Sequence, residues 1–198
     1  MTALIVIDIQ NDFCPNGALA VKGGDEIVAP INARMNQYDT VIMTQDWHPR
    51  MHMSFADNHD VEPFSTIEAS YGTQVLWPRH CVEGSAGADF HPLLDSRRAD
   101  AIIRKGFRKE IDSYSAFFEN DKSTATGLEG YLRTRGIKAV DFVGLATDFC
   151  VAWSAIDAAK LGLTSRVLLP LTRAIDFDGS LENAIREMKA AGVEIVND

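Results

Sequence analysis

The chain has 198 residues, of which 46% are hydrophobic and 24% are charged, and its formal net charge is -9 at pH 7. This length and composition are typical of one globular domain with a buried core, and they exclude a disordered or fibrous chain. The acidic balance contains no basic run. We therefore expect neither nucleic acid nor an anionic membrane surface as a partner, and a small-molecule substrate is favoured.

Short apolar runs, most of them rich in Val, Ile or Leu, alternate with longer stretches of helical periodicity. This alternation predicts an open parallel sheet of about six strands with helices on both faces, an α/β fold of three layers. The predicted strands, in chain order, are 3–9, 40–44, 101–104, 139–144, 165–169 and 193–196, and the predicted helices are 24–37, 125–135, 149–161 and 180–191.

One long segment interrupts this alternation. Residues 45–98 show no convincing strand or long helix, and aromatic, proline and histidine residues crowd into them. Connections longer than about 12 to 15 residues are uncommon in compact domains unless they carry function. No linker divides the sequence, so we expect 1–198 to be a single domain, with a metal- and substrate-binding insertion at about 45–98. The insertion leaves the carboxyl end of the second strand, where open α/β sheets bind ligands.

Asp8, Lys105 and Cys150 share this carboxyl edge of the predicted sheet. Cys150 falls in the first turn of a predicted helix that Thr147 or Asp148 can cap, where free amides and the helix dipole stabilise a thiolate. A carboxylate can accept the thiol proton, and an ammonium can hold the charged forms in place. The three residues together predict a nucleophilic cysteine with its base. Taken singly, each has an ordinary alternative: a buried structural cysteine, a turn-capping aspartate and a solvated lysine.

Asp46, His48, His52 and His80 have the ligand types of a transition-metal site. Imidazole and carboxylate suit Zn, Fe or Mn, and such a set leaves positions open for water and substrate. We therefore expect one divalent transition metal ion, with zinc ahead of iron and manganese. The alternative is a group of loop histidines on a polar surface.

Phe13 lies near Asp8 in the sequence, and Trp77 lies near the proposed ligand His80. They are predicted to stack a flat ring, although packing in the core is the commoner role of aromatic side chains.

Cys14, Cys81 and Cys150 are an odd number of cysteines in a chain too large to need disulfides. No apolar stretch is long enough to cross a bilayer, and no basic segment precedes the first apolar run. We therefore expect free thiols and a cytoplasmic protein. The sequence leaves open whether the chain forms a homo-oligomer.

Most of these residues lie in six short blocks, which extend from the first predicted strand past Cys150. The blocks are IDIQNDF at 7–13, TQDWHP at 44–49, HMSF at 52–55, WPRHCV at 77–82, KG at 105–106 and GLATDFCV at 144–151. In this order they resemble the nicotinamidase and pyrazinamidase group of the isochorismatase-like cysteine hydrolases.

The resemblance implies hydrolysis of nicotinamide to nicotinate and ammonia through a cysteine thioester, a step of NAD salvage, with pyrazinamide also accepted. It implies a cis peptide bond between Leu145 and Ala146, which helps to aim the backbone amides of Ala146 and Cys150 as an oxyanion hole. The third metal ligand, here His52, varies within the family. The site residues that the resemblance implies are Asp8, Lys105 and Cys150 for catalysis, Phe13 and Trp77 for the substrate, and Asp46, His48, His52 and His80 for the metal.

Three other functions remain as alternatives. A hydrolase of the same fold with another substrate, such as an isochorismatase or a carbamoyl amidohydrolase, typically lacks the histidine-rich cluster. A catalytically silent binding module predicts decay of the catalytic residues, and the sequence shows none. In a zinc hydrolase whose metal-bound hydroxide attacks, Cys150 would be structural, and thiol labelling separates this alternative from cysteine catalysis.

Overall fold

The computed structural model describes residues 1–197, and its main sheet has six strands in the order β5-β2-β1-β6-β7-β8. All neighbouring strands run parallel. The predicted open parallel sheet is confirmed, and each predicted apolar run contributes one strand. The strands are β1 Thr2–Ile7, β2 Val41–Asp46, β5 Ala101–Lys105, β6 Ala139–Leu145, β7 Thr164–Arg173 and β8 Glu194–Val196.

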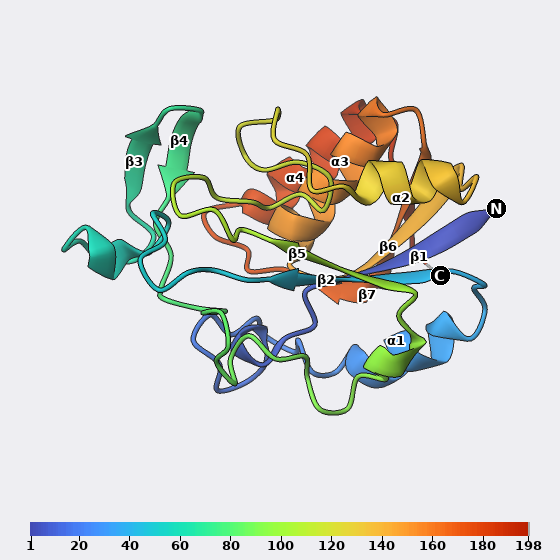
Figure 1. The fold of residues 1–198 in the computed structure, drawn as a ribbon, viewed down its shortest axis with the longest axis horizontal. Helices are drawn as coiled ribbons and strands as arrows, with labels where there is room; N and C mark the ends of the chain where they lie inside the picture. The colour runs from blue at the N-terminus through green and yellow to red at the C-terminus, as the bar shows by residue number, and fades with distance from the viewer. Residues whose placement is uncertain (198) are drawn as a thin grey trace.

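Helices cover both faces of the sheet, with α1 on one face and α2, α3 and α4 on the other (Figure 1). Consecutive strand residues point to opposite faces, so each face buries its own apolar cluster. Leu4 of β1 packs in the cluster that contains Ile31 of α1, whereas the next residue, Ile5, packs in the cluster that contains Leu132 of α2. The helices are α1 Val28–Met35, α2 Leu128–Thr134, α3 Ala152–Lys160 and α4 Ser180–Ala190.

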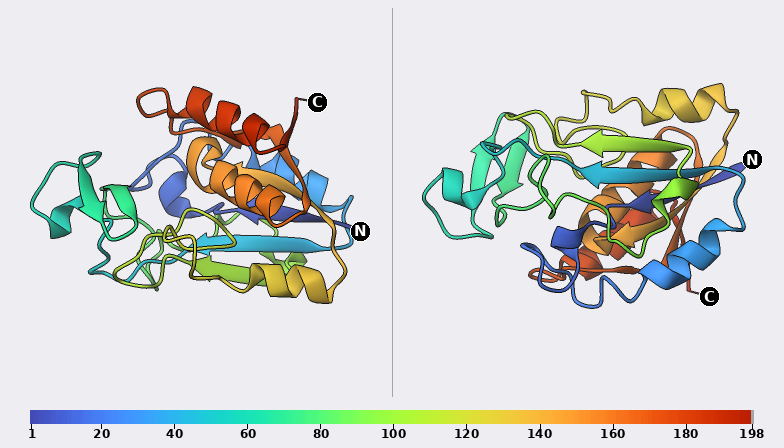
Figure 2. Two further views of the ribbon diagram at one scale, coloured as in Figure 1. Left: turned by 90° about the horizontal axis from the view of Figure 1, so that it is seen from above. Right: turned by 60° about the horizontal axis from the view of Figure 1, so that its bottom comes forward.

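The insertion contains two strands that the sequence did not predict. β3 (Thr66–Ala69) and β4 (Gly72–Val75) form an antiparallel hairpin, which stands apart from the main sheet (Figures 1 and 2). The expectation that this segment lacks strands is therefore wrong at the hairpin. Each strand is only four residues long and is largely exposed, so it lacks the apolar run by which buried strands are recognised.

The order of the strands places a topological switch point between β1 and β6. From β1 the chain adds β2 and β5 on one side of the sheet and β6, β7 and β8 on the other. Open α/β sheets bind ligands beyond the carboxyl ends of strands at such a point. Asp8 directly follows β1, Asp46 ends β2, Lys105 ends β5, and Cys150 follows β6. Four strands therefore bring these potentially reactive side chains to the same edge of the sheet.

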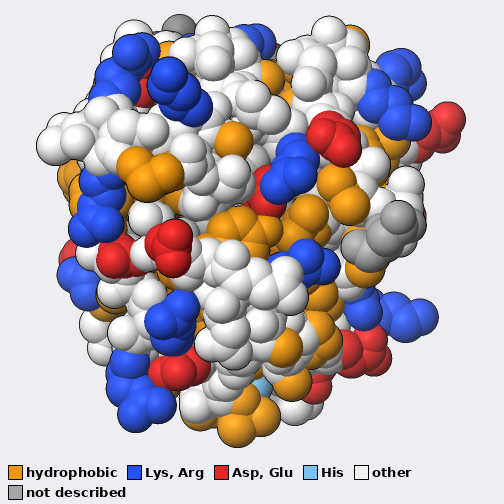
Figure 3. All heavy atoms as spheres, turned by 90° about the vertical axis from the view of Figure 1, so that its right-hand side faces the viewer, with side chains coloured by type: hydrophobic (Ala, Val, Ile, Leu, Met, Phe, Trp, Pro, Cys, Tyr) orange, Lys and Arg blue, Asp and Glu red, His pale blue; other side chains and the backbone are white. Residues whose placement is uncertain are grey.

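The opposite end of the sheet faces the viewer in Figure 3, where apolar side chains gather among scattered charged ones. A surface cavity near the amino ends of β6 and β7 is lined by Leu132, Ile137 and Leu163, among others. It contains none of the predicted site residues. Within residues 1–197, no helix is both long enough and apolar enough to span a membrane.

Candidate active site

The structure brings the three predicted catalytic side chains together around the ammonium of Lys105. Its Nζ lies 3.0 Å from Oδ2 of Asp8 and 3.4 Å from Sγ of Cys150. It also donates to the carbonyl of Ser113 at 2.9 Å. Lys105 and Asp8 are fully buried, and Cys150 is 7% exposed. A buried charge is costly unless it is paired, so the lysine and the aspartate stabilise each other here.

Asp8 is oriented by Thr44 of the neighbouring strand β2. The backbone N–H of Asp8 donates to Oγ1 of Thr44 at 3.1 Å, and the threonine hydroxyl donates to Oδ1 of Asp8 at 2.5 Å. Apart from its ion pair with Lys105, Oδ2 has no hydrogen-bond partner among residues 1–197. Burial raises the pKa of Asp8, although the charge of Lys105 opposes the increase. A carboxylate with a raised pKa, whose Oδ2 pairs only with the Lys105 ammonium among the described groups, is suited to act as a general base.

Cys150 lies in the π-helical turn Thr147–Val151, which leads into α3. Neither Thr147 nor Asp148 caps this turn, contrary to the expectation from the sequence. The hydroxyl of Thr147 instead donates to Oγ1 of Thr172 at 2.8 Å, and the carboxylate of Asp148 accepts the backbone N–H of Ile175 at 3.1 Å. Both side chains therefore anchor the end of β7 and the segment after it.

Burial raises the pKa of the Cys150 thiol well above its ordinary value, although the charge of Lys105 opposes this and that of Asp8 adds to it. The expected lowering of this pKa by a helix N-terminus and a cation is therefore wrong for the free protein. Desolvation outweighs the charge of Lys105 in setting this pKa, because the sulfur is enclosed by the pocket walls. The thiol consequently needs a base, and Asp8 is the carboxylate beside it.

The peptide bond between Leu145 and Ala146 is cis, as the family resemblance implies. Ala146 directly precedes the cysteine turn, and its carbonyl accepts the N–H of Phe149 and the N–H of Val151, each at 3.1 Å. The assignment of the Ala146 and Cys150 amides as an oxyanion hole stays a prediction.

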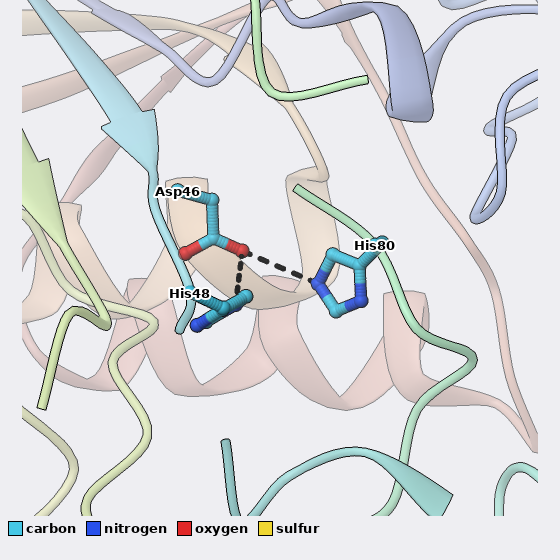
Figure 4. Close-up of side chains that lie close together, drawn as sticks. All are labelled: Asp46, His48 and His80. Carbon is cyan, nitrogen blue, oxygen red and sulfur yellow. Dashed lines mark hydrogen bonds and ion pairs between the residues drawn. The ribbon is translucent and has the colours of Figure 1, made fainter. Parts of the chain in front are cut away.

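Asp46, His48 and His80 form a compact group of metal-ligand types (Figure 4). The Nε2 atoms of the two histidines lie 2.9 and 3.3 Å from Oδ2 of Asp46. Nδ1 of His48 faces the carbonyl of Gly106 at 2.8 Å, and Nδ1 of His80 faces that of Pro78 at 2.7 Å. A carbonyl can only accept, so each Nδ1 carries a proton, and Nε2 is the ring nitrogen that each histidine directs to the group. Two imidazole nitrogens and a carboxylate oxygen fit a divalent transition metal.

Asp46 also connects this group to Lys105. Its Oδ1 lies 2.8 Å from Nζ of Lys105, while its Oδ2 faces the two histidines. Burial alone would raise the pKa of Asp46, but the charges of His48 and Lys105 hold it well below its ordinary value. The carboxylate is therefore ionised at neutral pH and is shared between the two groups.

The predicted fourth ligand, His52, is not part of this group. Its ring lies against that of His48, with the centroids 4.2 Å apart, and its Nε2 faces the carbonyl of Ile111 at 3.2 Å. It forms a separate set of ligand types with His48 and Asp112. Burial, assisted by the nearby His48, lowers the pKa of His52 to about 4. The ring is therefore neutral at pH 7, and it packs against the ring of His48.

Both groups border a small cavity, and the predicted ring-binding residues Phe13 and Trp77 line it. The hydroxyl of Tyr114 accepts the indole N–H of Trp77 at 3.0 Å. The ring of Phe149 meets Trp77 edge-on, with the centroids 4.9 Å apart. Aromatic walls with Cys150 at the cavity surface favour a flat ring that carries a reactive carbonyl group.

Sequence reasoning missed Asp112, Tyr114, Phe149 and Ile175, all of which line the cavity. Asp112 and Tyr114 lie in the connection 106–127 between β5 and α2, which contains no helix or strand. Like the longer insertion at 45–98, a connection of this length is uncommon in compact domains. Its length was therefore the signal that could have directed attention to it.

The fold and the site define an open α/β protein in which a buried aspartate, lysine and cysteine lie beside an aspartate–histidine group. A family model described as the Isochorismatase domain matches residues 2–197. The chain therefore belongs to the isochorismatase family.

Individual relatives are similar over nearly the whole chain. A nicotinamidase of Acinetobacter baylyi is 56% identical over 98% of this chain and 92% of its own length. A solved structure described as a nicotinamidase and pyrazinamidase of Acinetobacter baumanii has a TM-score of 0.97 and 52% identity, over 98% of this chain and 95% of its own. A pyrazinamidase of Pyrococcus horikoshii, solved in complex with zinc, has a TM-score of 0.80 and 34% identity, over 100% of this chain and 99% of its own.

Proposed function

We propose that this protein is a nicotinamidase, an amidohydrolase that converts nicotinamide and water into nicotinate and ammonia. The observation that carries the proposal is the position of the Lys105 ammonium, 3.0 Å from the Asp8 carboxylate and 3.4 Å from the Cys150 sulfur, at the edge of an aromatic cavity. The 56% identical nicotinamidase supports the same activity. Pyrazinamide is the expected second substrate.

The first half of the reaction transfers the acyl group to Cys150. Asp8 accepts the thiol proton, and the thiolate attacks the carboxamide carbon of the substrate. Lys105 compensates the negative charge that moves between the carboxylate and the sulfur. The backbone N–H groups of Ala146 and Cys150 are proposed to stabilise the oxyanion. Protonated Asp8 then gives its proton to the amide nitrogen, the C–N bond breaks, and ammonia leaves a thioester on Cys150.

The second half of the reaction hydrolyses this thioester. Asp8, again ionised, accepts a proton from water while the water oxygen attacks the thioester carbon. The C–S bond breaks, nicotinate forms, and the proton held by Asp8 returns to the sulfur of Cys150. Asp8 thus acts twice as base and twice as acid, for which its raised pKa is suited.

Asp46, His48 and His80 are proposed to hold a divalent transition metal, with zinc expected ahead of iron and manganese. When bound, such a metal supplies an open coordination position for a ring nitrogen of the substrate. The related Pyrococcus horikoshii pyrazinamidase, solved with zinc, supports a metal at this site. His52 is proposed to support His48 from behind rather than to complete this group.

We expect the protein to act in the cytoplasm. Cys14, Cys81 and Cys150 are all free thiols in the structure. Free thiols are typical of a reducing compartment, where disulfides do not persist.

Ammonia release from nicotinamide by the purified, metal-loaded protein tests the proposed function. The wild-type protein should release ammonia and nicotinate in equal amounts, and Cys150→Ala should release neither. Isochorismate is the control substrate, because the same fold serves several chemistries. Cleavage of isochorismate without hydrolysis of nicotinamide would contradict the proposal.

A further inference from the structure

Gln10 lies two residues after Asp8 and is fully buried. Its Oε1 accepts the backbone N–H of Asp46 at 2.8 Å, and its Nε2 donates to the backbone carbonyl of Asp46, also at 2.8 Å. The same Nε2 donates to the carbonyl of Ala88 at 2.9 Å. The side-chain amide of Gln10 therefore pairs with both backbone polar groups of Asp46, as a neighbouring strand would.

These hydrogen bonds take the place of the β1–β2 strand pairing, which ends before it reaches Asp46. The pairing of β1 with β2 ends at Val6 and Met43, before β2 reaches Asp46. On its other side, Asp46 is in register with Lys105 of β5. Without Gln10, the backbone N–H and C=O of Asp46 would lose the partners that they have here. Buried backbone N–H and C=O groups need partners, and the glutamine supplies them.

Gln10 is itself held firmly in place. Its backbone forms an isolated antiparallel bridge with Phe90, and the N–H of His91 donates to the carbonyl of Ile9 at 2.9 Å. The amide of Gln10 therefore has little freedom to follow Asp46 if that residue moves. It fixes the end of β2 relative to the segment that carries Asp8.

We propose that Gln10 is a positioning residue, which holds Asp46 so that its carboxylate contacts two partners at once. Oδ1 of Asp46 must meet Lys105 at 2.8 Å, while Oδ2 must meet Nε2 of His48 at 2.9 Å. A shift of the Asp46 backbone disturbs both contacts together. Groups that orient metal ligands typically contribute about 10- to 100-fold in metal affinity or activity. The inference rests on the proposed function: its activity readout depends on nicotinamide hydrolysis, and its metal readout depends on the proposed metal site alone.

Gln45 offers a matched control because it is the same residue type in almost the same place. It is buried, with 6% exposure, and its Nε2 donates to the same carbonyl of Ala88, at 3.2 Å. Its Oε1 accepts from Arg104 rather than from Asp46. Loss of its amide therefore removes a comparable buried hydrogen bond without releasing the Asp46 backbone.

The test compares Gln10→Leu, Gln10→Met and Gln45→Leu with the wild-type protein. Zinc affinity, measured by competition with a chelator, should weaken by at least about 10-fold in both Gln10 variants and by less than about 3-fold in Gln45→Leu. With nicotinamide, the Gln10 variants should show a lower kcat and a higher KM. Both parameters change because Asp46 contacts the catalytic lysine as well as the metal group.

Thermal unfolding of the metal-free proteins shows which variants fold. Gln10→Met preserves the length of the side chain, so it provides the test if Gln10→Leu does not fold. A folded Gln10 variant with wild-type zinc affinity would overturn the inference, and so would an equal loss in Gln45→Leu. Failure of both Gln10 variants to fold beside a folded Gln45→Leu would also overturn it, because Gln10 would then be a stability residue. If the wild-type protein leaves nicotinamide intact while the zinc affinities differ as expected, only the proposed function fails.

Discussion

Lys105 and Asp46 form a buried ion pair, with Nζ 2.8 Å from Oδ1 and side-chain exposures of 0% and 5%. The same ammonium lies 3.0 Å from Asp8. One cation therefore pairs with two carboxylates, Asp8 of the proposed catalytic group and Asp46 of the proposed metal group. Burial alone would lower the pKa of Lys105, but the charges of Asp46 and Asp8 raise it well above its ordinary value. The two halves of the site thus form a single electrostatic unit.

Removal of this cation should destabilise the fold as well as abolish activity. Lys105→Met leaves Asp8 and Asp46 as buried carboxylates without their common partner, so the free energy of unfolding should fall by about 3–5 kcal/mol. Lys109→Met is the control, because Lys109 and its partner Glu110 are 60% and 76% exposed, and its loss should cost about 1 kcal/mol or less. Urea unfolding measures both changes. Equal losses in the two variants would contradict the shared role of Lys105.

The absence of a side chain at Gly106 should matter for metal binding. A Cβ atom here would lie 2.4 Å from Cε1 of His48, and the φ angle of Gly106 is +68°. Gly136 has a φ of +65°, but the nearest atom to its Cβ position would be 3.8 Å away, in Met1. Both Gly106→Ala and Gly136→Ala should lose about 1 kcal/mol of stability because of backbone strain. Only Gly106→Ala should also weaken zinc binding, which chelator competition measures; a similar weakening in Gly136→Ala would refute this explanation.

His52 should make the metal-free protein sensitive to mild acid. Its folded-state pKa is about 4 because of burial, whereas its ordinary value is 6.5. Between these values the unfolded chain binds a proton that the folded chain does not. The stabilising contribution is therefore complete above about pH 6.5 and is lost as the pH falls towards 4, at up to about 1.4 kcal/mol per pH unit. His52→Gln should lose less stability over this range in denaturant unfolding, and parallel curves for the two proteins would show that His52 contributes nothing.

Substrate choice should depend on the ring nitrogen. Benzamide has the ring shape and carboxamide of nicotinamide but offers no nitrogen lone pair to a metal held by Asp46, His48 and His80. Its kcat/KM should be at least about 10-fold lower, which corresponds to about 1.4 kcal/mol of transition-state binding. Pyrazinamide keeps a suitably placed nitrogen and should be hydrolysed. Steady-state kinetics with the three amides checks this, and equal rates for benzamide and nicotinamide would exclude metal-directed binding.

The strands and the candidate catalytic residues could be predicted because their signals are local. Asp8 and Lys105 directly adjoin or end apolar strand runs, so knowledge of the parallel sheet was enough to bring them to one edge. The same reasoning placed Cys150 at that edge. Local pattern also located the four helices, whose apolar periodicity is clear.

Contacts between distant segments could not be predicted in the same way. The pKa of Cys150 depends on how completely the surrounding walls exclude water, which no local pattern reports. The separation of His52 from the metal group depends on the fold of the loop that supplies the Ile111 carbonyl. The roles of Tyr114 and Gln10 likewise arise from hydrogen bonds to residues more than 30 positions away in the sequence.

Cys150 is proposed to carry the acyl group during hydrolysis. Rapid acid quenching of the metal-loaded protein during turnover of nicotinamide, followed by mass spectrometry of the Cys150 peptide, detects this intermediate. A nicotinoyl adduct should appear on Cys150 and on neither Cys14 nor Cys81, and Cys150→Ala should form no adduct and release no ammonia. Sustained ammonia release by folded Cys150→Ala would contradict the account and favour a hydrolase in which metal-bound hydroxide attacks.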